Sequence, residues 1–195
     1  MCADRNVDVS GGAVAGWPDV PGDTALTIKV PPADPLVRAD FPAHVTVLYP
    51  FLHESRIDAA TDREIAGLFA GHAAFTLTFD TFGRFPGVLC LAPTPHTPVT
   101  APTQHLTAHW PETVPYRGIF GASPAPHLTI ANDEGPATQD TVYRTLEAGL
   151  APRLPLSCRV EAVHLITWDG QRWQDRTAYP LAAGTCGVDA SQRSE

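Results

Sequence analysis

The chain has 195 residues, of which 44% are hydrophobic and 17% are charged, and its formal net charge is −8. This length and apolar content fit one globular domain with a sizeable core. The negative charge argues against tight sequence-independent binding to long nucleic acid, because that affinity comes from Lys and Arg side chains that neutralise phosphates.

The first half of the chain predicts strands, a helix and a hairpin. Alternating or β-branched runs predict strands over residues 25–30, 45–49, 75–85 and 88–92. A short helix or loop over 32–39 is expected between the first two strands. A helix is predicted over 57–70, since Thr61 and Glu64 form a capping-box pattern near its start and Gly71 follows its end. Pro86 and Gly87 mark the hairpin turn.

The second half repeats the order of strand, helix and hairpin. Predicted elements are a short helix over 100–110, a loop over 116–121, a strand over 128–131, a helix over 138–151, and strands over 156–167 and 172–181. The last two form a hairpin around Asp169-Gly170, a strong turn dipeptide. We expect loose tails over residues 1–22 and 184–195, with one domain over 23–183 between them.

Two segments, beginning at His44 and His127, share the pattern histidine, apolar residue, threonine, apolar residue. Successive side chains of a strand point to opposite faces, so each histidine shares a face with the threonine two residues on, Thr46 or Thr129. If the two strands are neighbours, two imidazoles and two hydroxyls converge. Such a cleft could hold a phosphate between an acid and a base.

A third copy of the pattern begins at His105, and we interpret it as a coincidence. It lies in the predicted helix over 100–110, where residues two apart do not share a face, so His105 and Thr107 cannot act as a pair. His105 and His109 have a spacing that can bind metal, but no third ligand with suitable spacing is evident. We therefore predict no metal site.

The two halves also agree in register. His127 follows His44 by 83 residues, and Cys158, at the start of the second hairpin, follows Phe75, at the start of the first, by the same interval. This agreement predicts an internal duplication, with two α+β lobes related by a pseudo-twofold axis and the motif strands facing one another.

The residues around both motifs resemble the 2H phosphoesterase superfamily, and in particular its 2'-5' RNA ligase-like (LigT-like) branch. The resemblance rests on Pro-Ala-His-Val-Thr-Val-Leu-Tyr-Pro-Phe over 42–51 and Pro-His-Leu-Thr-Ile-Ala over 126–131, and it covers roughly residues 24–181. It implies an α+β, bilobal, duplicated fold of two antiparallel-sheet lobes, with helices outside and the active site in the groove between them. It also implies no metal or other cofactor.

The resemblance further implies a reaction on 2',3'-cyclic phosphates or 2'-5' phosphodiester linkages, with possible reversal to RNA ligation. By position, His127 would be the base and His44 the acid of hydrolysis, while Thr46 and Thr129 would hydrogen-bond the non-bridging phosphoryl oxygens. The sequence departs from many relatives after the second motif, where Asn132-Asp133-Glu134 replaces a basic residue. That departure argues against a polynucleotide or highly charged substrate.

Four further residues are candidates for substrate binding. Tyr49 and Phe51 follow the first motif strand and Tyr116 precedes the second, so their rings could stack on a nucleobase or pack between the lobes. Arg117 could neutralise a phosphate or lie in solvent.

These observations predict a metal-independent phosphoesterase acting on a small nucleotide or an RNA terminus with a cyclic phosphate. The alternatives are a nucleotide- or RNA-binding module with the same cleft but little turnover, and a metal-dependent hydrolase that uses His105 and His109. No apolar run approaches the ~20 residues of a membrane span, and the four cysteines are scattered. We expect a cytoplasmic monomer with no membrane or DNA-duplex partner.

Overall fold

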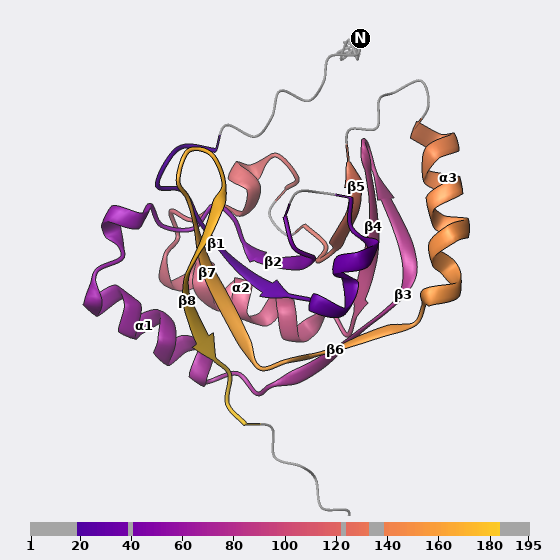
Figure 1. Ribbon diagram of the computed structural model, residues 1–195. Helices are drawn as coiled ribbons and strands as arrows, with labels where there is room; N and C mark the ends of the chain where they lie inside the picture. The colour runs from indigo at the N-terminus through magenta and orange to yellow at the C-terminus, as the bar shows by residue number, and fades with distance from the viewer. Residues whose placement is uncertain (1–18, 39–40, 122–123, 133–138, 184–195) are drawn as a thin grey trace, which may run out of the picture.

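The computed structural model describes residues 19–38, 41–121, 124–132 and 139–183 (Figure 1). The described residues form an eight-stranded antiparallel sheet and three α-helices. The strands are β1 Thr24–Lys29, β2 His44–Leu48, β3 Phe75–Phe85, β4 Val88–Thr94, β5 Leu128–Asn132, β6 Leu156–Val160, β7 Ala162–Trp168 and β8 Trp173–Pro180. The helices are α1 Ala59–Ala70, α2 Thr97–His109 and α3 Gln139–Leu150. Short 3-10 turns cover Pro31–Leu36, Glu54–Arg56, Pro115–Gly118 and Ala151–Arg153.

The strand order is β6-β3-β4-β5-β2-β1-β7-β8, which places the two motif strands next to one another at the centre. Only one register pair, Val45 with Leu128, joins β2 to β5, whereas the neighbouring strand pairs share several. The curled sheet therefore divides at this junction into a first lobe (β1, β2, β7, β8) and a second lobe (β3, β4, β5, β6) (Figure 1). The predicted α+β fold with two antiparallel lobes is confirmed.

Each lobe takes strands from both halves of the sequence. The β3–β4 hairpin follows β1 and β2 in the chain but joins the second lobe, and the β7–β8 hairpin returns to the first. Phe75 and Cys158, which are as far apart in sequence as the two motif histidines, therefore begin or lie in two strands of one lobe, β3 and β6. These strands pair side by side, with Leu77 opposite Cys158. The lobes do not coincide with the two sequence halves, because each hairpin crosses to the other lobe.

Two helix starts differ from their predictions. Asp58 caps α1, because its carboxylate accepts the backbone N–H groups of Ala60 and Thr61 at 3.0 and 2.9 Å, and the predicted capping box does not form. α2 begins at Thr97 rather than near Thr100, so Pro102 lies inside the helix. An earlier proline occupies the first turn of α2, and this is the position where a missing N–H costs nothing.

The strand predicted over 156–167 is two strands that separate at Glu161. β6 lies on the outer edge of the second lobe beside β3, while β7 pairs with β8 in the first lobe. The predicted hairpin around Asp169-Gly170 is confirmed for β7 and β8, and Trp168 lies opposite Trp173 beside the turn. The buried positions change phase at the break, from Cys158 and Val160 in β6 to Val163 and Leu165 in β7, and this change is the signal in the sequence that marks two strands.

The helices cover the outer face of the sheet (Figure 1). α1 packs against β8, and α2 packs against β2 and contributes Val99 and Leu106 to the main core. The apolar residues of the motif strands lie in the same core, including Val45 and Leu128, which have no exposed surface. In the described part of the chain, no helix has the length and apolarity needed to cross a membrane.

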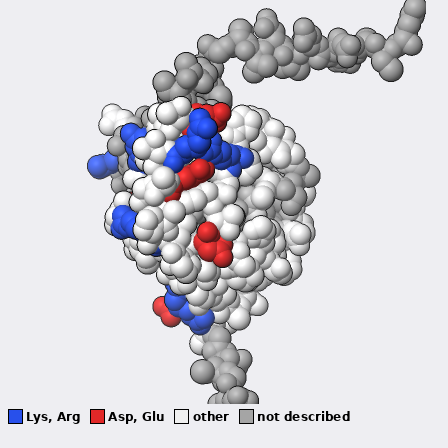
Figure 2. Space-filling view, turned by 90° about the vertical axis from the view of Figure 1, so that its right-hand side faces the viewer, with Lys and Arg blue, Asp and Glu red and all other residues white. Residues whose placement is uncertain are grey.

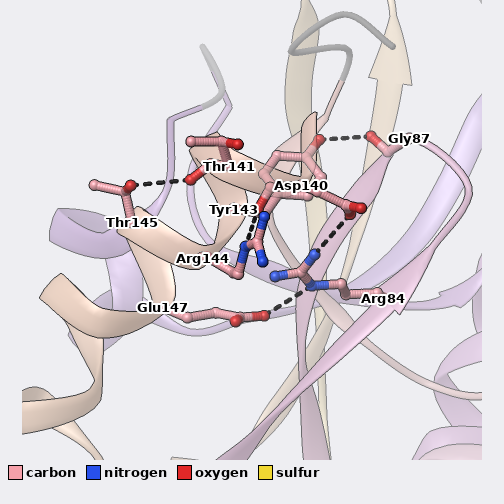
Figure 3. A network of polar contacts seen from close by, with 8 residues as sticks. All are labelled: Arg84, Gly87, Asp140, Thr141, Tyr143, Arg144, Thr145 and Glu147. Atoms are coloured by element: carbon pink, nitrogen blue, oxygen red, sulfur yellow. Dashed lines mark hydrogen bonds and ion pairs between the residues drawn. The ribbon is translucent and has the colours of Figure 1, made fainter. Parts of the chain in front are cut away.

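α3 is fixed to the second lobe by polar contacts (Figure 3). The Arg84 guanidinium of β3 donates to Glu147 at 2.9 Å and to Asp140 at 3.1 Å, and the Tyr143 hydroxyl donates to the carbonyl of Gly87 at 2.8 Å.

Figure 2 shows that charged side chains are few on this face of the molecule and that positive and negative groups lie beside one another. The face therefore offers no extended basic surface for a nucleic-acid backbone.

Candidate functional site

The two motifs meet on one face of the sheet. Val45 and Leu128 are opposite one another and buried, so the residues on either side of them point to the other face. In this antiparallel register His44 lies across from Thr129, and Thr46 lies across from His127. We call the sheet face that carries these four side chains the motif face. It presents two imidazoles on one diagonal and two hydroxyls on the other.

Both histidines are held in the same way. The Nδ1 atom of His44 lies 2.9 Å from the carbonyl oxygen of Pro42, and that of His127 lies 3.0 Å from the carbonyl oxygen of Ala125. A carbonyl only accepts, so in both rings Nδ1 carries the hydrogen. When either ring is neutral, its Nε2 therefore has a lone pair that can take a proton, and when the ring is charged, Nε2 can give one.

An aromatic ring packs on each histidine, and neither ring was predicted from the sequence. Phe41 meets His44 edge-on, with 4.7 Å between the ring centroids, and Phe85 lies 5.1 Å from His127 at a tilt. Phe85 is 41% exposed although it is a large apolar residue at the end of β3. The available signal was positional, since Phe41 lies three residues before the first motif and Phe85 ends an alternating strand. The rings restrict the orientations of the imidazoles.

The pKa of His44 is lowered from its usual 6.5, mainly because burial disfavours the charged ring and also because His127 lies near enough to repel it. The hydrogen bond to Pro42 opposes this effect without cancelling it. The folded protein therefore holds His44 neutral at pH 7. Since the unfolded chain takes up this proton near pH 6.5 and the folded chain only at lower pH, this group reduces folding stability as the pH falls below about 6.5.

An NMR titration of the imidazole Cε1–H signals should show His44 titrating below pH 6.5. Replacing His127 by Gln removes the neighbouring charge and should raise the pKa of His44 without restoring 6.5, because burial is the larger cause. His105→Gln, on the outer helix α2, serves as the matched control and should leave the His44 titration in place. A His44 pKa at or above 6.5 in the wild-type protein would contradict the arrangement described above.

Tyr116 lies beside both motifs. Its ring stacks near His127 at a centroid distance of 6.5 Å, and its hydroxyl is hydrogen-bonded to Thr46. Burial raises the pKa of this hydroxyl, so the phenol is neutral at physiological pH. The ring and Thr46 also line a cavity of about 60 Å³ between β2, α2 and the segment 124–126. Of the four predicted binding residues, Tyr116 is the one that the structure brings to the motif face.

The backbone around Tyr116 is strained. Tyr116 and Arg117 both adopt left-handed conformations, with φ of 47° and 51°, which cost energy for residues other than Gly. The Tyr116 N–H donates to the carbonyl of Tyr49 at 2.5 Å, and the Arg117 guanidinium donates to Asp23 at 2.7 Å. These contacts hold the strained segment against β1 and the end of β2.

The other predicted binding residues lie elsewhere. Arg117 is ion-paired with Asp23 and its guanidinium lies 5.7 Å from the Tyr49 ring centroid. Tyr49 is buried, and its hydroxyl donates to Asp19. Phe51 is 6% exposed and packs edge-on against Trp110 in the main core. The structure therefore does not bring Phe51 to the motif face, and it engages Arg117 with protein groups.

The third copy of the motif is helical, as predicted, and its residues point apart. The His105 ring contacts His72 with 3.1 Å between nitrogen atoms, whereas the Thr107 hydroxyl bonds to the carbonyl of Thr103 in its own helix. His109 contacts Glu64 at 3.3 Å. Among the described residues, no three His, Cys, Asp or Glu side chains gather as metal ligands.

Asn132 ends β5 and is exposed, while Asp133 and Glu134 lie outside the described residues.

Comparisons with known proteins give one family match and several similar folds. A family model described as the 2'-5' RNA ligase superfamily matches residues 28–172, which include both motifs. A search of curated proteins finds no match. Similar solved structures include E. coli LigT complexed with 3'-AMP, with 19% identity, a TM-score of 0.55, and coverage of 83% of this chain and 99% of that chain.

Two further crystal structures have the same fold. One is described as a phosphoesterase, with 18% identity and a TM-score of 0.54 over 84% of this chain and 99% of that chain. The other is TT0787 of Thermus thermophilus, with 16% identity and a TM-score of 0.53 over 83% of this chain and 99% of that chain. The family model covers more than half of the sequence and both motif strands. The chain therefore belongs to the 2'-5' RNA ligase superfamily.

Proposed function

We propose that this protein is a metal-independent phosphoesterase that hydrolyses a 2',3'-cyclic phosphate, on a nucleotide or an RNA terminus, or a 2'-5' phosphodiester. One observation carries the proposal: His44 and His127 lie on adjacent strands, with Nδ1 of each bonded to a backbone carbonyl and with a threonine hydroxyl across from each ring. Two imidazoles positioned around one phosphate can serve as the general base and the general acid of an in-line displacement at phosphorus.

In hydrolysis, Nε2 of His127 takes a proton from water as the water oxygen bonds to phosphorus. The bond from phosphorus to one ribose oxygen breaks, and Nε2 of His44 gives that oxygen a proton. The reaction consumes the cyclic diester and one water molecule and forms a phosphate monoester. His44 is neutral in the free protein, and an anionic phosphate beside it raises its pKa so that it can be the acid. Reversal would exchange the two roles.

The threonine hydroxyls of Thr46 and Thr129 donate to the non-bridging oxygens of the phosphate. Their fixed positions on the motif strands preorganise these donors, which favours the transition state because its charge lies on those oxygens. E. coli LigT crystals with 3'-AMP and with ATP support a nucleotide as the kind of ligand bound. Tyr116 contributes by holding Thr46, and its ring lies beside His127.

The direct test is incubation of the purified chain with 2',3'-cyclic AMP in EDTA, followed by chromatography that separates the 2'- from the 3'-monophosphate. We expect the 2'-monophosphate to form in the presence of the chelator. Absence of product, with nucleotide binding detected by calorimetry, would instead support the binding module with little turnover. Activity lost on chelation and restored by a divalent ion would support the metal-dependent alternative.

A further inference from the structure

An open pocket of about 600 Å³ lies on the first lobe, outside the two motifs. Its lining combines three aromatic rings, two amide side chains and the only lysine of the sequence, namely Phe41, Trp168, Trp173, Gln171, Gln174 and Lys29. This volume and this mixture of apolar rings with a few polar groups are typical of small-molecule sites.

The pocket adjoins His44. Phe41, which lines it, packs edge-on against the His44 ring, and Pro42, which also lines it, supplies the carbonyl that holds His44 Nδ1 at 2.9 Å. Lys29 is opposite His44 in the register between β1 and β2, so its side chain shares the motif face. A substrate whose phosphate contacts His44 can therefore extend into this pocket.

The charges in the pocket are already balanced by the protein. Lys29 Nζ lies 2.6 Å from the Asp175 carboxylate, and Arg172 Nε lies 3.9 Å from Asp169. The pocket thus offers little net positive charge to a second phosphate. Its rings suit a flat aromatic group, since stacking on an aromatic side chain accepts any base, and amides can hydrogen-bond to the edge of a base as donors and as acceptors.

We propose that this pocket binds the nucleobase of the substrate. The proposal rests on the proposed function, in which His44 protonates the departing ribose oxygen. That oxygen belongs to the nucleoside, so the nucleoside lies on the His44 side of the phosphate, where the pocket is, and water approaches from the His127 side. The substrate is therefore a nucleoside cyclic phosphate with its base against Phe41 and Trp173, rather than a cyclic phosphate of a simple polyol.

A kinetic comparison tests the base contact. The ratio of kcat/KM for 2',3'-cyclic AMP to that for glycerol 1,2-cyclic phosphate should fall about 5- to 150-fold in Trp173→Ala, the range expected for one base–aromatic stack. Trp173→Phe keeps a ring and should restore most of the ratio. A ratio within about twofold of the wild-type value, whatever happens to the separate rates, overturns the proposal.

A binding experiment on the wild-type protein tests the pocket independently of turnover and of the fold of Trp173 variants. The indole N–H signals of Trp168 and Trp173, followed by NMR, should shift on addition of adenosine, while that of the core residue Trp110 should not. Ribose 5-phosphate is the control without a base. Shifts without hydrolysis would retain the pocket and reject the proposed function. Hydrolysis without adenosine-specific shifts would retain the function and reject the pocket.

Discussion

Replacing either His44 or His127 by alanine should lower kcat for 2',3'-cyclic AMP by about 10²- to 10⁴-fold, the contribution typical of one positioned acid or base. The two rings act in the same displacement, so the double variant should lose much less than the product of the single losses. His105→Ala, taken from the helical third copy of the motif, is the matched control and should keep wild-type kcat. Single variants with wild-type rates would exclude both histidines from the chemistry.

The division of labour between the histidines can be measured with an activated substrate. Bis(4-nitrophenyl) phosphate, which carries no nucleoside, has a leaving group that departs without a proton, so loss of the acid should matter less for it than for the cyclic diester. On this substrate we expect His44→Ala to retain a larger fraction of the wild-type rate than His127→Ala does. The opposite order would assign His44 as the base, which is the role that its lowered pKa favours in the free protein.

Replacing Thr46 or Thr129 by valine, which keeps the β-branched shape, should lower kcat by about 10²- to 10³-fold while KM changes little. The reason is that a fixed donor to a non-bridging oxygen acts more strongly on the charge of the transition state than on the bound substrate. Steady-state kinetics with 2',3'-cyclic AMP measure the effect. Thr107→Val, on α2, is the control from the third copy of the motif. An increase in KM with unchanged kcat would show that the hydroxyls bind the substrate and the transition state equally well.

The variant Tyr116→Phe tests the role of Thr46 separately from that of Thr129, again by steady-state kinetics with 2',3'-cyclic AMP. It removes the hydroxyl that is bonded to Thr46 and leaves the Thr129 side of the site in place. We expect it to reduce kcat by less than Thr46→Val, because the threonine hydroxyl remains. An effect as large as that of Thr46→Val would mean that the phenol itself contacts the phosphate.

The sequence predicts the central features of the fold because local patterns encode them. The alternation of buried Val45 and Val47 with half-buried His44 and Thr46 places the motif side chains on one face before any tertiary contact is known. The helical flanks of His105 likewise separate the third copy from the other two. The tetrapeptide alone would not have distinguished them.

What the sequence does not predict depends on long-range contacts. Phe85, which ends β3, reaches His127 through the order of the strands in the sheet, and Phe51 enters the core because Trp110 packs against it. Arg117 looks like a free cation in the sequence, but Asp23, far away in the chain, pairs with it. Such partners follow from the order of strands in the sheet, which periodicity does not give.

The exchange of hairpins between the lobes has a consequence for biosynthesis. β2, which carries His44, pairs with β1, and β1 needs β7 as its other neighbour, so the first lobe is completed only when the last strands have left the ribosome. The second lobe waits in the same way for β5 and β6. Pairings between residues so distant in sequence fold slowly and leave strand edges exposed meanwhile. A nascent chain that stops before β7 therefore carries both motif histidines without the complete framework that brings them together.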